Sequence, residues 1–269
     1  MRRVCERLGK SRAAYYKHIQ VENQKGVEKL VLKEIVLKQR KDMPRLGGRK
    51  LYHEIQPALE DHQLKLGRDK LFAWLKANDL LVRPKKRYIR TTNSTHRFRV
   101  HENLLMKEKI EQPDQAWVCD ITYLRLVNGF CYLALITDVF SRKIIGYHVN
   151  DTLELKGCIK ALEMASSQRK THLETIHHSD RGIQYCSNVY VNMLRQRGIL
   201  ISMAEAGNRY ENAIAERVNG ILKDEFNLDA TFITIEQATQ ACKHAIRTYN
   251  EKRPHMAIGL KKPAELYAA

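Results

Sequence analysis

Two β-prone runs that flank an Asn-Gly pair constrain the fold of this chain more than any other feature. "AWVCDITYLRLV" (116–127) and "FCYLALITDVF" (130–140) are rich in β-branched and aromatic residues. Asn128-Gly129 between them is typical of a type I′ turn, so we expect an antiparallel hairpin. "KIIGYHVND" (143–151) follows closely and predicts a third strand. A three-stranded meander therefore begins at residue 116.

After the meander, helical and strand patterns alternate. Helices are predicted over 153–168, 187–198, 208–226 and 235–250, and strands over 173–178 and 199–203. Asn208 and Glu211 resemble a capping box at the start of the third of these helices. Alternating elements after a meander predict an α/β fold, in which helices flank a mixed sheet.

The N-terminal part of the chain is much more basic than the rest. The formal net charge is +17; residues 1–112 hold 28 Lys and Arg against 13 Asp and Glu, whereas residues 113–269 hold 19 against 17. A basic excess confined to one region indicates a polyanionic partner, so we expect the front to bind nucleic acid. The other open interpretation is an ordinary helical bundle with solvated lysines.

Four segments are predicted from these patterns. Residues 1–20 are expected to form a partial helix-turn-helix-like segment with Ser11 as a helix N-cap, although an ordinary helical hairpin fits equally well. Residues 21–82 are predicted to form a small all-α DNA-binding domain, with helices near 49–60 and 68–78. Residues 83–112 are basic and aperiodic, which indicates a linker that touches phosphates or a disordered connector. Residues 113–269 form the α/β domain.

Cysteine usage and hydropathy exclude several classes of protein. The six cysteines are scattered without a CxxC pair, which argues against a structural zinc site and a secreted disulfide scaffold. No run approaches the roughly 20 apolar residues that span a bilayer. We expect a cytoplasmic protein without a membrane partner.

Three acids are candidates for chemistry. Asp120 interrupts an apolar strand, where an acid is costly unless it is paired or bound to a cation. Asp180 follows the strand "LETIHH", and Gly182 beside it makes an ordinary turn aspartate the simpler interpretation. Glu216 lies on the helix of 208–226, where Asn212, Asn219 and Lys223 fall within about 60° of it around the axis. These four residues form a polar stripe along the helix that is narrower than the polar face of a typical solvent-exposed helix.

The spacing of the three acids is similar to that of a known protein family. Asp120, Asp180 and Glu216 make a D,D-35-E signature, with 35 residues between the last two. With the blocks "WVCDITYL", "TDVFSRKIIGYHV", "HHSDRGIQY", "GNRYENAIAERVNGILKDE" and "YNEKRPHMAIGLKKPAELY", the chain resembles the retroviral-integrase-like DDE transposases. In particular, it is similar to the second-reading-frame product of the bacterial insertion sequence 3 family. Leu46, Glu205 and Glu211 depart from the family pattern.

The resemblance implies a ribonuclease-H-like core and a polynucleotidyl transferase. Asp120, Asp180 and Glu216 would be catalytic and would hold two Mg²⁺ ions, with Mn²⁺ as a substitute. The implied partner is double-stranded DNA, both the terminal inverted repeats of the element and the target. A homo-oligomer on DNA, a fusion with the upstream-frame product and a place at the bacterial nucleoid are also implied.

Further DNA contacts and structural roles are expected around these acids. The predicted DNA-binding residues are Lys223, Asn212, Asn219, Arg45, Arg49, Lys85, Lys86 and Arg87. Asp138 is expected to form structural hydrogen bonds rather than bind metal. His177 and His178 are adjacent on a strand and point to opposite faces, so they cannot share one ion; one is expected to pack inward and the other to lie near the site.

Two other functions stay open. A DNA-binding regulator of transposition could use the basic front while its acidic core is inactive. A ribonuclease-H-type nuclease would hydrolyse nucleic acid without joining strands. The intact acid trio argues against the first, and the basic helical front argues against the second.

Overall fold

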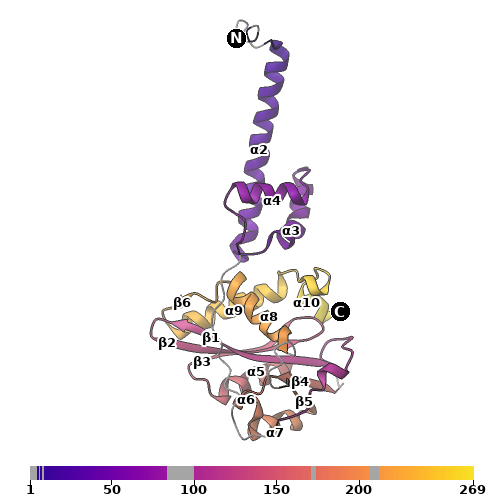
Figure 1. The fold of residues 1–269 in the computed structure, drawn as a ribbon, viewed down its shortest axis with the longest axis vertical. Coiled ribbons are helices and arrows are strands. Elements are labelled where there is room, and N and C mark those ends of the chain that lie inside the picture. The colour runs from indigo at the N-terminus through magenta and orange to yellow at the C-terminus, as the bar shows by residue number, and fades with distance from the viewer. Residues whose placement is uncertain (1–4, 6, 8, 84–99, 171–173, 206–211) are drawn as a thin grey trace. The chain divides into compact units, whose positions relative to one another are not determined.

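The computed structural model describes residues 5, 7, 9–83, 100–170, 174–205 and 212–269. It divides into two compact units, Met1–Val82 and Arg83–Ala269 (Figure 1). The predicted phosphate-contacting Lys85, Lys86 and Arg87 lie outside the described residues, as does the predicted capping box of Asn208 and Glu211.

Among its described residues, the first unit contains the helices α2 (Arg12–Asp42), α3 (Gly48–Asp61) and α4 (Arg68–Ala77). Ser11 caps α2 as predicted, because its side chain accepts a hydrogen bond from the Ala14 amide at 3.1 Å. Helix α2 runs without a break through residue 20, where the sequence suggested a change of segment. No proline interrupts residues 12–42, so the helical pattern continues. Its C-terminal part packs on α3 through Leu32, Ile35 and Val36.

The second unit is a mixed sheet with helices on both faces (Figure 1). The strands are β1 (Ala116–Leu126), β2 (Gly129–Asp138), β3 (Ile144–Asn150), β4 (Thr175–Ser179), β5 (Ile199–Met203) and β6 (Thr231–Phe232). The order is β3-β2-β1-β4-β5, and β6 pairs with the far end of β1. Strands β1 to β3 are antiparallel, whereas β4 and β6 each run parallel to β1. The predicted meander and the α/β fold are confirmed.

The β1–β2 hairpin forms as predicted, but its turn differs from type I′. The strands close at the pair Leu126 and Gly129. A type I′ turn requires positive φ at both central residues, here Val127 and Asn128. Positive φ falls instead on Gly129, at 113°, and on neither central residue. Glycine takes up the left-handed backbone conformation after the turn.

Each face of the sheet is covered by its own helices. These are α5 (Leu155–Gln168), α6 (Ile183–Cys186), α7 (Asn188–Gln196), α8 (Ala213–Glu225), α9 (Ile235–Glu251) and α10 (Pro263–Ala268), with the 3₁₀ turns η1 (Leu105–Lys107) and η3 (Met256–Ile258). Helices α8 and α9 pack on one face around Leu124, Leu133 and Val218. Helices α5 and α7 pack on the other around Trp117, Leu162 and Tyr190. Within the described part of the chain, no helix is long and apolar enough to cross a membrane.

Candidate active site

The sheet splits beside the residue that the sequence singled out on β1. Strand β1 pairs with β4 over Ala116–Cys119 and with β6 over Arg125–Leu126. The last paired residues of β1 and β4 are Cys119 and Ser179. Asp120, which continues β1, and Asp180, which follows the end of β4, each come next in the chain. They therefore start at the same level of two adjacent strands, which lie about 4.8 Å apart. The register therefore brings together two acids that are 60 residues apart in sequence.

The carboxylate of Asp120 is held from two sides. Its Oδ2 accepts a hydrogen bond from Asn219 Nδ2 at 2.7 Å, and its Oδ1 accepts one from the Ile121 amide at 2.9 Å. Burial, followed by the negative charge of Asp180, raises the pKa of Asp120 to about 7; the charge of Glu216 adds a smaller increase. All three predicted acids are thus close enough to interact at this carboxylate.

Asp180 lies in a turn, as the simpler interpretation suggested, and also beside Asp120. Its Oδ1 accepts a hydrogen bond from the Gly182 amide at 3.0 Å. A Cβ atom on residue 182 would lie 2.9 Å from that oxygen, closer than such contacts normally come. Glycine at 182 therefore leaves the space in which the carboxylate sits. Asp180 is therefore both a turn aspartate and a neighbour of Asp120 at the split in the sheet.

Helix α8 presents Glu216 in its first turn, where the helix dipole favours a negative charge. Glu216 is exposed, whereas Asn212 and Asn219 on either side of it are buried. Asn212 Nδ2 donates to the Cys119 carbonyl at 3.1 Å, and Asn219 donates to Asp120. The two amides therefore fix α8 on the open edge of β1. Both amide nitrogens bond within the protein, and the DNA contacts predicted for Asn212 and Asn219 stay predictions.

Lys223 lies two turns beyond Glu216 on the same helix. Its ammonium nitrogen is 4.2 Å from the centre of the Tyr123 ring, a cation–π contact. Tyr123 is on β1, three residues after Asp120, and packs edge-on against Phe130 at 5.3 Å. The aromatic pair thus holds the lysine side chain on the side of β1 where the sheet is split.

The adjacent histidines both belong to the interior. His177 Nε2 lies 2.8 Å from Cys119 Sγ and 2.9 Å from the Tyr190 hydroxyl. Burial lowers the pKa of His177 to about 3, so its ring is neutral. His178 Nδ1 lies 2.8 Å from Ser202 Oγ on β5. Their side chains diverge as the strand geometry requires, but both are buried rather than one lying open at the site.

A buried polar network, which the sequence did not reveal as a unit, supports the base of β1. Asp138 Oδ1 accepts from the Ser141 amide at 2.7 Å, and its Oδ2 accepts from the Asp114 amide at 2.8 Å. The Asp114 carboxylate in turn accepts from Trp117 Nε1 at 3.1 Å and from the Tyr267 hydroxyl at 2.8 Å. The structural role predicted for Asp138 is confirmed. Asp114 follows a proline and looks like any turn aspartate, so only its φ of 65° marks it as unusual.

Helix α9 and the segment directly after it are tied to α8 and β3 by side chains whose role the sequence left uncertain. Arg253 forms a bidentate ion pair with Glu225, at 2.8 and 2.9 Å, and is almost fully buried. Asn250 accepts from the Ile144 amide and donates to its carbonyl, both at 2.9 Å. The Tyr249 hydroxyl donates to the Arg142 carbonyl at 2.9 Å. These contacts position the helix that carries Glu216 and Lys223.

The remaining predicted DNA contacts lie in the first unit. Arg49 is exposed on the first turn of α3, and Arg45 is half-buried in the turn before it. Both therefore lie at the entry to α3, in the turn that separates it from α2.

The donor set at the split sheet suits a divalent cation. Carboxylate and amide oxygens are the ligands that Mg²⁺ prefers, and mutual repulsion of the acids would be relieved by a cation. Asn219 Oδ1 is buried without a hydrogen-bond partner, next to Asp120. In the described ranges, however, no group of three or more His, Cys, Asp or Glu side chains is close enough to hold an ion. The acids fit a metal in their chemistry, but they are neighbours rather than a closed coordination shell.

The chain matches two family models, both described as an integrase core domain, over residues 110–209 and 197–263. It is 34% identical over 267 residues to the insertion element IS600 uncharacterized 31 kDa protein of Shigella sonnei, which covers 97% of this chain and 96% of that protein. It is 33% identical over 195 residues to the transposase InsF for insertion sequence IS3fB of Escherichia coli (strain K12), which covers 72% and 68%.

A solved structure supports the fold. A chain in the cryoEM structure of the simian T-cell lymphotropic virus intasome, in complex with PP2A regulatory subunit B56 gamma, matches with a TM-score of 0.50. The sequence identity is 19%, and the match covers 80% of this chain and 70% of that one. The second unit thus has the ribonuclease-H-like fold of integrase cores, as predicted. The chain belongs to the bacterial insertion-sequence transposases with an integrase core, a family of polynucleotidyl transferases.

Proposed function

We propose that the chain cleaves the ends of its insertion element and joins them to target DNA, with Asp120, Asp180 and Glu216 as the catalytic residues. The observation that carries this proposal is the electrostatic environment of Asp120. Its pKa is raised to about 7 by burial and by the other two acids. Three acids gathered at the break in a sheet are unfavourable for folding unless they serve a cation.

The three carboxylates would hold two Mg²⁺ ions, for which Mn²⁺ would substitute. When bound, such ions activate an attacking oxygen and stabilise the leaving oxygen at a phosphodiester. The protein's own residues do the positioning. Asn219 fixes the Asp120 carboxylate, Gly182 gives Asp180 its space, and the exposed Glu216 is free to approach both from α8.

DNA is the proposed substrate and partner. The basic first unit, including Arg45 and Arg49, would bind the terminal inverted repeats. The predicted linker would contact phosphates through Lys85, Lys86 and Arg87. Lys223, held over Tyr123, would bind a phosphate near the acids. We also propose that the chain forms a homo-oligomer on DNA and that it acts at the nucleoid. A fusion in which the chain is joined to an upstream-frame product is part of the same proposal.

The test is a strand-cleavage assay on the full chain with duplex DNA that carries the inverted repeats flanking its gene. We expect nicks and joined products in Mg²⁺ or Mn²⁺ and none in a chelator. Glu216→Gln should lower the rate about 100-fold or more, since a transition-state charge interaction is lost. Glu163→Gln, an exposed acid on α5, is the matched control and should leave the rate unchanged.

A regulator with an inactive core is the second candidate. The lack of a closed metal-ligating cluster among the described residues favours it. In that case the full chain would bind the repeats without cleaving them in any divalent metal. Cleavage without joined products would instead indicate a nuclease of the same fold.

A further inference from the structure

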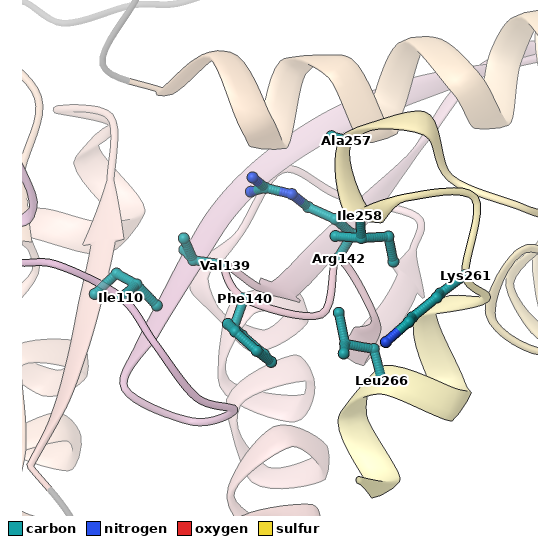
Figure 2. Close-up of a pocket in the computed structure, with 8 residues that line it drawn as sticks. All are labelled: Ile110, Val139, Phe140, Arg142, Ala257, Ile258, Lys261 and Leu266. Atoms are coloured by element: carbon teal, nitrogen blue, oxygen red, sulfur yellow. The ribbon is translucent and has the colours of Figure 1, made fainter.

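A pocket of about 430 Å³ opens on the second unit, away from the catalytic acids. It lies between the turn that joins β2 to β3 and the segment that leads into α10. Six of its eight lining residues are apolar, and the other two are Arg142 and Lys261. Figure 2 shows the Lys261 ammonium group beside Leu266, with Phe140 across the pocket from them. The pocket therefore combines an apolar floor with two cations.

Hydrogen bonds fix the backbone of Arg142, and its guanidinium group interacts electrostatically with Tyr249 and Asp138. Its φ is 65°, its amide donates to the Asp138 carbonyl at 3.0 Å, and its carbonyl accepts from the Tyr249 hydroxyl. One guanidinium nitrogen is buried without a hydrogen-bond partner. Asp138, the acid nearest in sequence, already accepts bonds from Ser141 and Asp114. Among the residues that line the pocket none is acidic, so an external anion would complete it.

The lining favours a protein segment over a nucleic acid. Contacts to DNA are made mainly to phosphates by polar and basic groups, and unpaired bases stack on aromatic rings. Here the floor is mostly aliphatic, with Phe140 as its one aromatic residue. An aliphatic pocket with cations at its rim fits an apolar anchor side chain that has carboxylates next to it.

The same chain carries such a segment at residues 151–154. Leu153 is 47% exposed, and the exposed acids Asp151 and Glu154 lie two residues before it and one after it. Its carbonyl accepts a hydrogen bond from Gln184 Nε2 at 2.8 Å, which holds the loop in place. Of the exposed large apolar residues in the described ranges, Leu153 alone has an acid within two positions on each side.

We propose that the loop 151–154 of one copy docks into the Arg142–Lys261 pocket of a second copy. Leu153 would fill the apolar floor, and Asp151 and Glu154 would pair with the two cations. The turn that bears Arg142 precedes β3 and the loop follows it, so the two surfaces are roughly 20 Å apart along that strand. Different surfaces meet in this contact, which is therefore head-to-tail and extends to further copies.

The test is self-association of the full chain without DNA, measured by sedimentation velocity from micromolar to hundreds of micromolar protein. We expect association that depends on concentration. Lys261→Glu and Glu154→Lys should each weaken it about tenfold, because each leaves a like-charge contact. The two changes combined should restore it, since the pair is then reversed. Leu153→Ser should weaken it with no rescue by either charge change.

Two controls guard against general effects. Lys243→Glu changes an exposed lysine on α9, and Ile233→Ser changes a side chain that is 73% exposed outside the loop; neither should alter association. Thermal unfolding verifies that each variant is folded. A chain that stays monomeric, or a charge reversal that fails to restore association, overturns the proposal. So does loss of DNA affinity in Lys261→Glu with unchanged association, which would assign the pocket to DNA.

Discussion

Two aspartates on neighbouring strands, Asp120 on β1 and Asp138 at the end of β2, have opposite surroundings. Three hydrogen-bond donors from Ser141 and Asp114 surround Asp138. Asp120 has two donors, but it also has the charges of Asp180 and Glu216 nearby. Burial raises the pKa of both. The surroundings of a buried acid, rather than its burial, distinguish a structural acid from a functional one.

The largest expected effect separates the two acids by activity. Asp120→Asn should lower DNA cleavage about 1000-fold or more, because a neutral amide lacks the negative charge with which the carboxylate would hold a metal ion. The variant should remain folded, since the change removes a repelled charge. Cleavage rates on repeat-bearing DNA and circular dichroism measure the two properties. Activity close to that of the unaltered chain would remove Asp120 from the site and end the contrast.

Asp138→Asn should act on stability instead. The new amide nitrogen would face the amide hydrogen of Asp114 or Ser141, so at least one buried donor would lose its acceptor. We expect the free energy of unfolding to fall by about 2 kcal/mol, as measured by urea denaturation. Cleavage per folded molecule should change little. A variant as stable as the unaltered chain would show that the donors around Asp138 contribute nothing.

The contrast was only partly visible in the sequence. The apolar run around Asp120 and the spacing to Glu216 are local patterns, and they indicated the acids correctly as neighbours. The pairing of Cys119 with Ser179 is a long-range contact that no local pattern specifies. Helical periodicity placed Asn212 and Asn219 on one stripe, but it could not show that β1 has an open edge there. The two amides of the stripe therefore face β1, whereas Glu216 between them is exposed.

The raised pKa of Asp120 should also make the stability of the protein depend on pH. The native pKa of Asp120, about 7, exceeds its ordinary value of 3.8, so the folded state binds a proton that the unfolded state releases. The contribution of this group to stability is greatest below about pH 4 and is lost as the pH rises to about 7. We expect a loss of about 4 kcal/mol that is absent from Asp120→Asn.

Urea denaturation in a chelator at several pH values measures this difference between the two proteins. Comparison with the variant cancels the titration of all other groups. Mg²⁺ should restore part of the stability at neutral pH, since it binds the folded state only. Equal pH profiles for the two proteins would mean that neither burial nor the charges of Asp180 and Glu216 raise the pKa of Asp120.

The smallest expected effect concerns the space beside Asp180. Gly182 has φ −64°, which any residue adopts, so Gly182→Ala tests contact alone rather than backbone strain. The new methyl group would lie 2.9 Å from Asp180 Oδ1 and would displace the carboxylate. We expect cleavage to slow several-fold, with weaker dependence on Mg²⁺ at low concentration. Gly157→Ala on α5, where the nearest atom to a Cβ is 3.4 Å away, is the control and should leave cleavage unchanged.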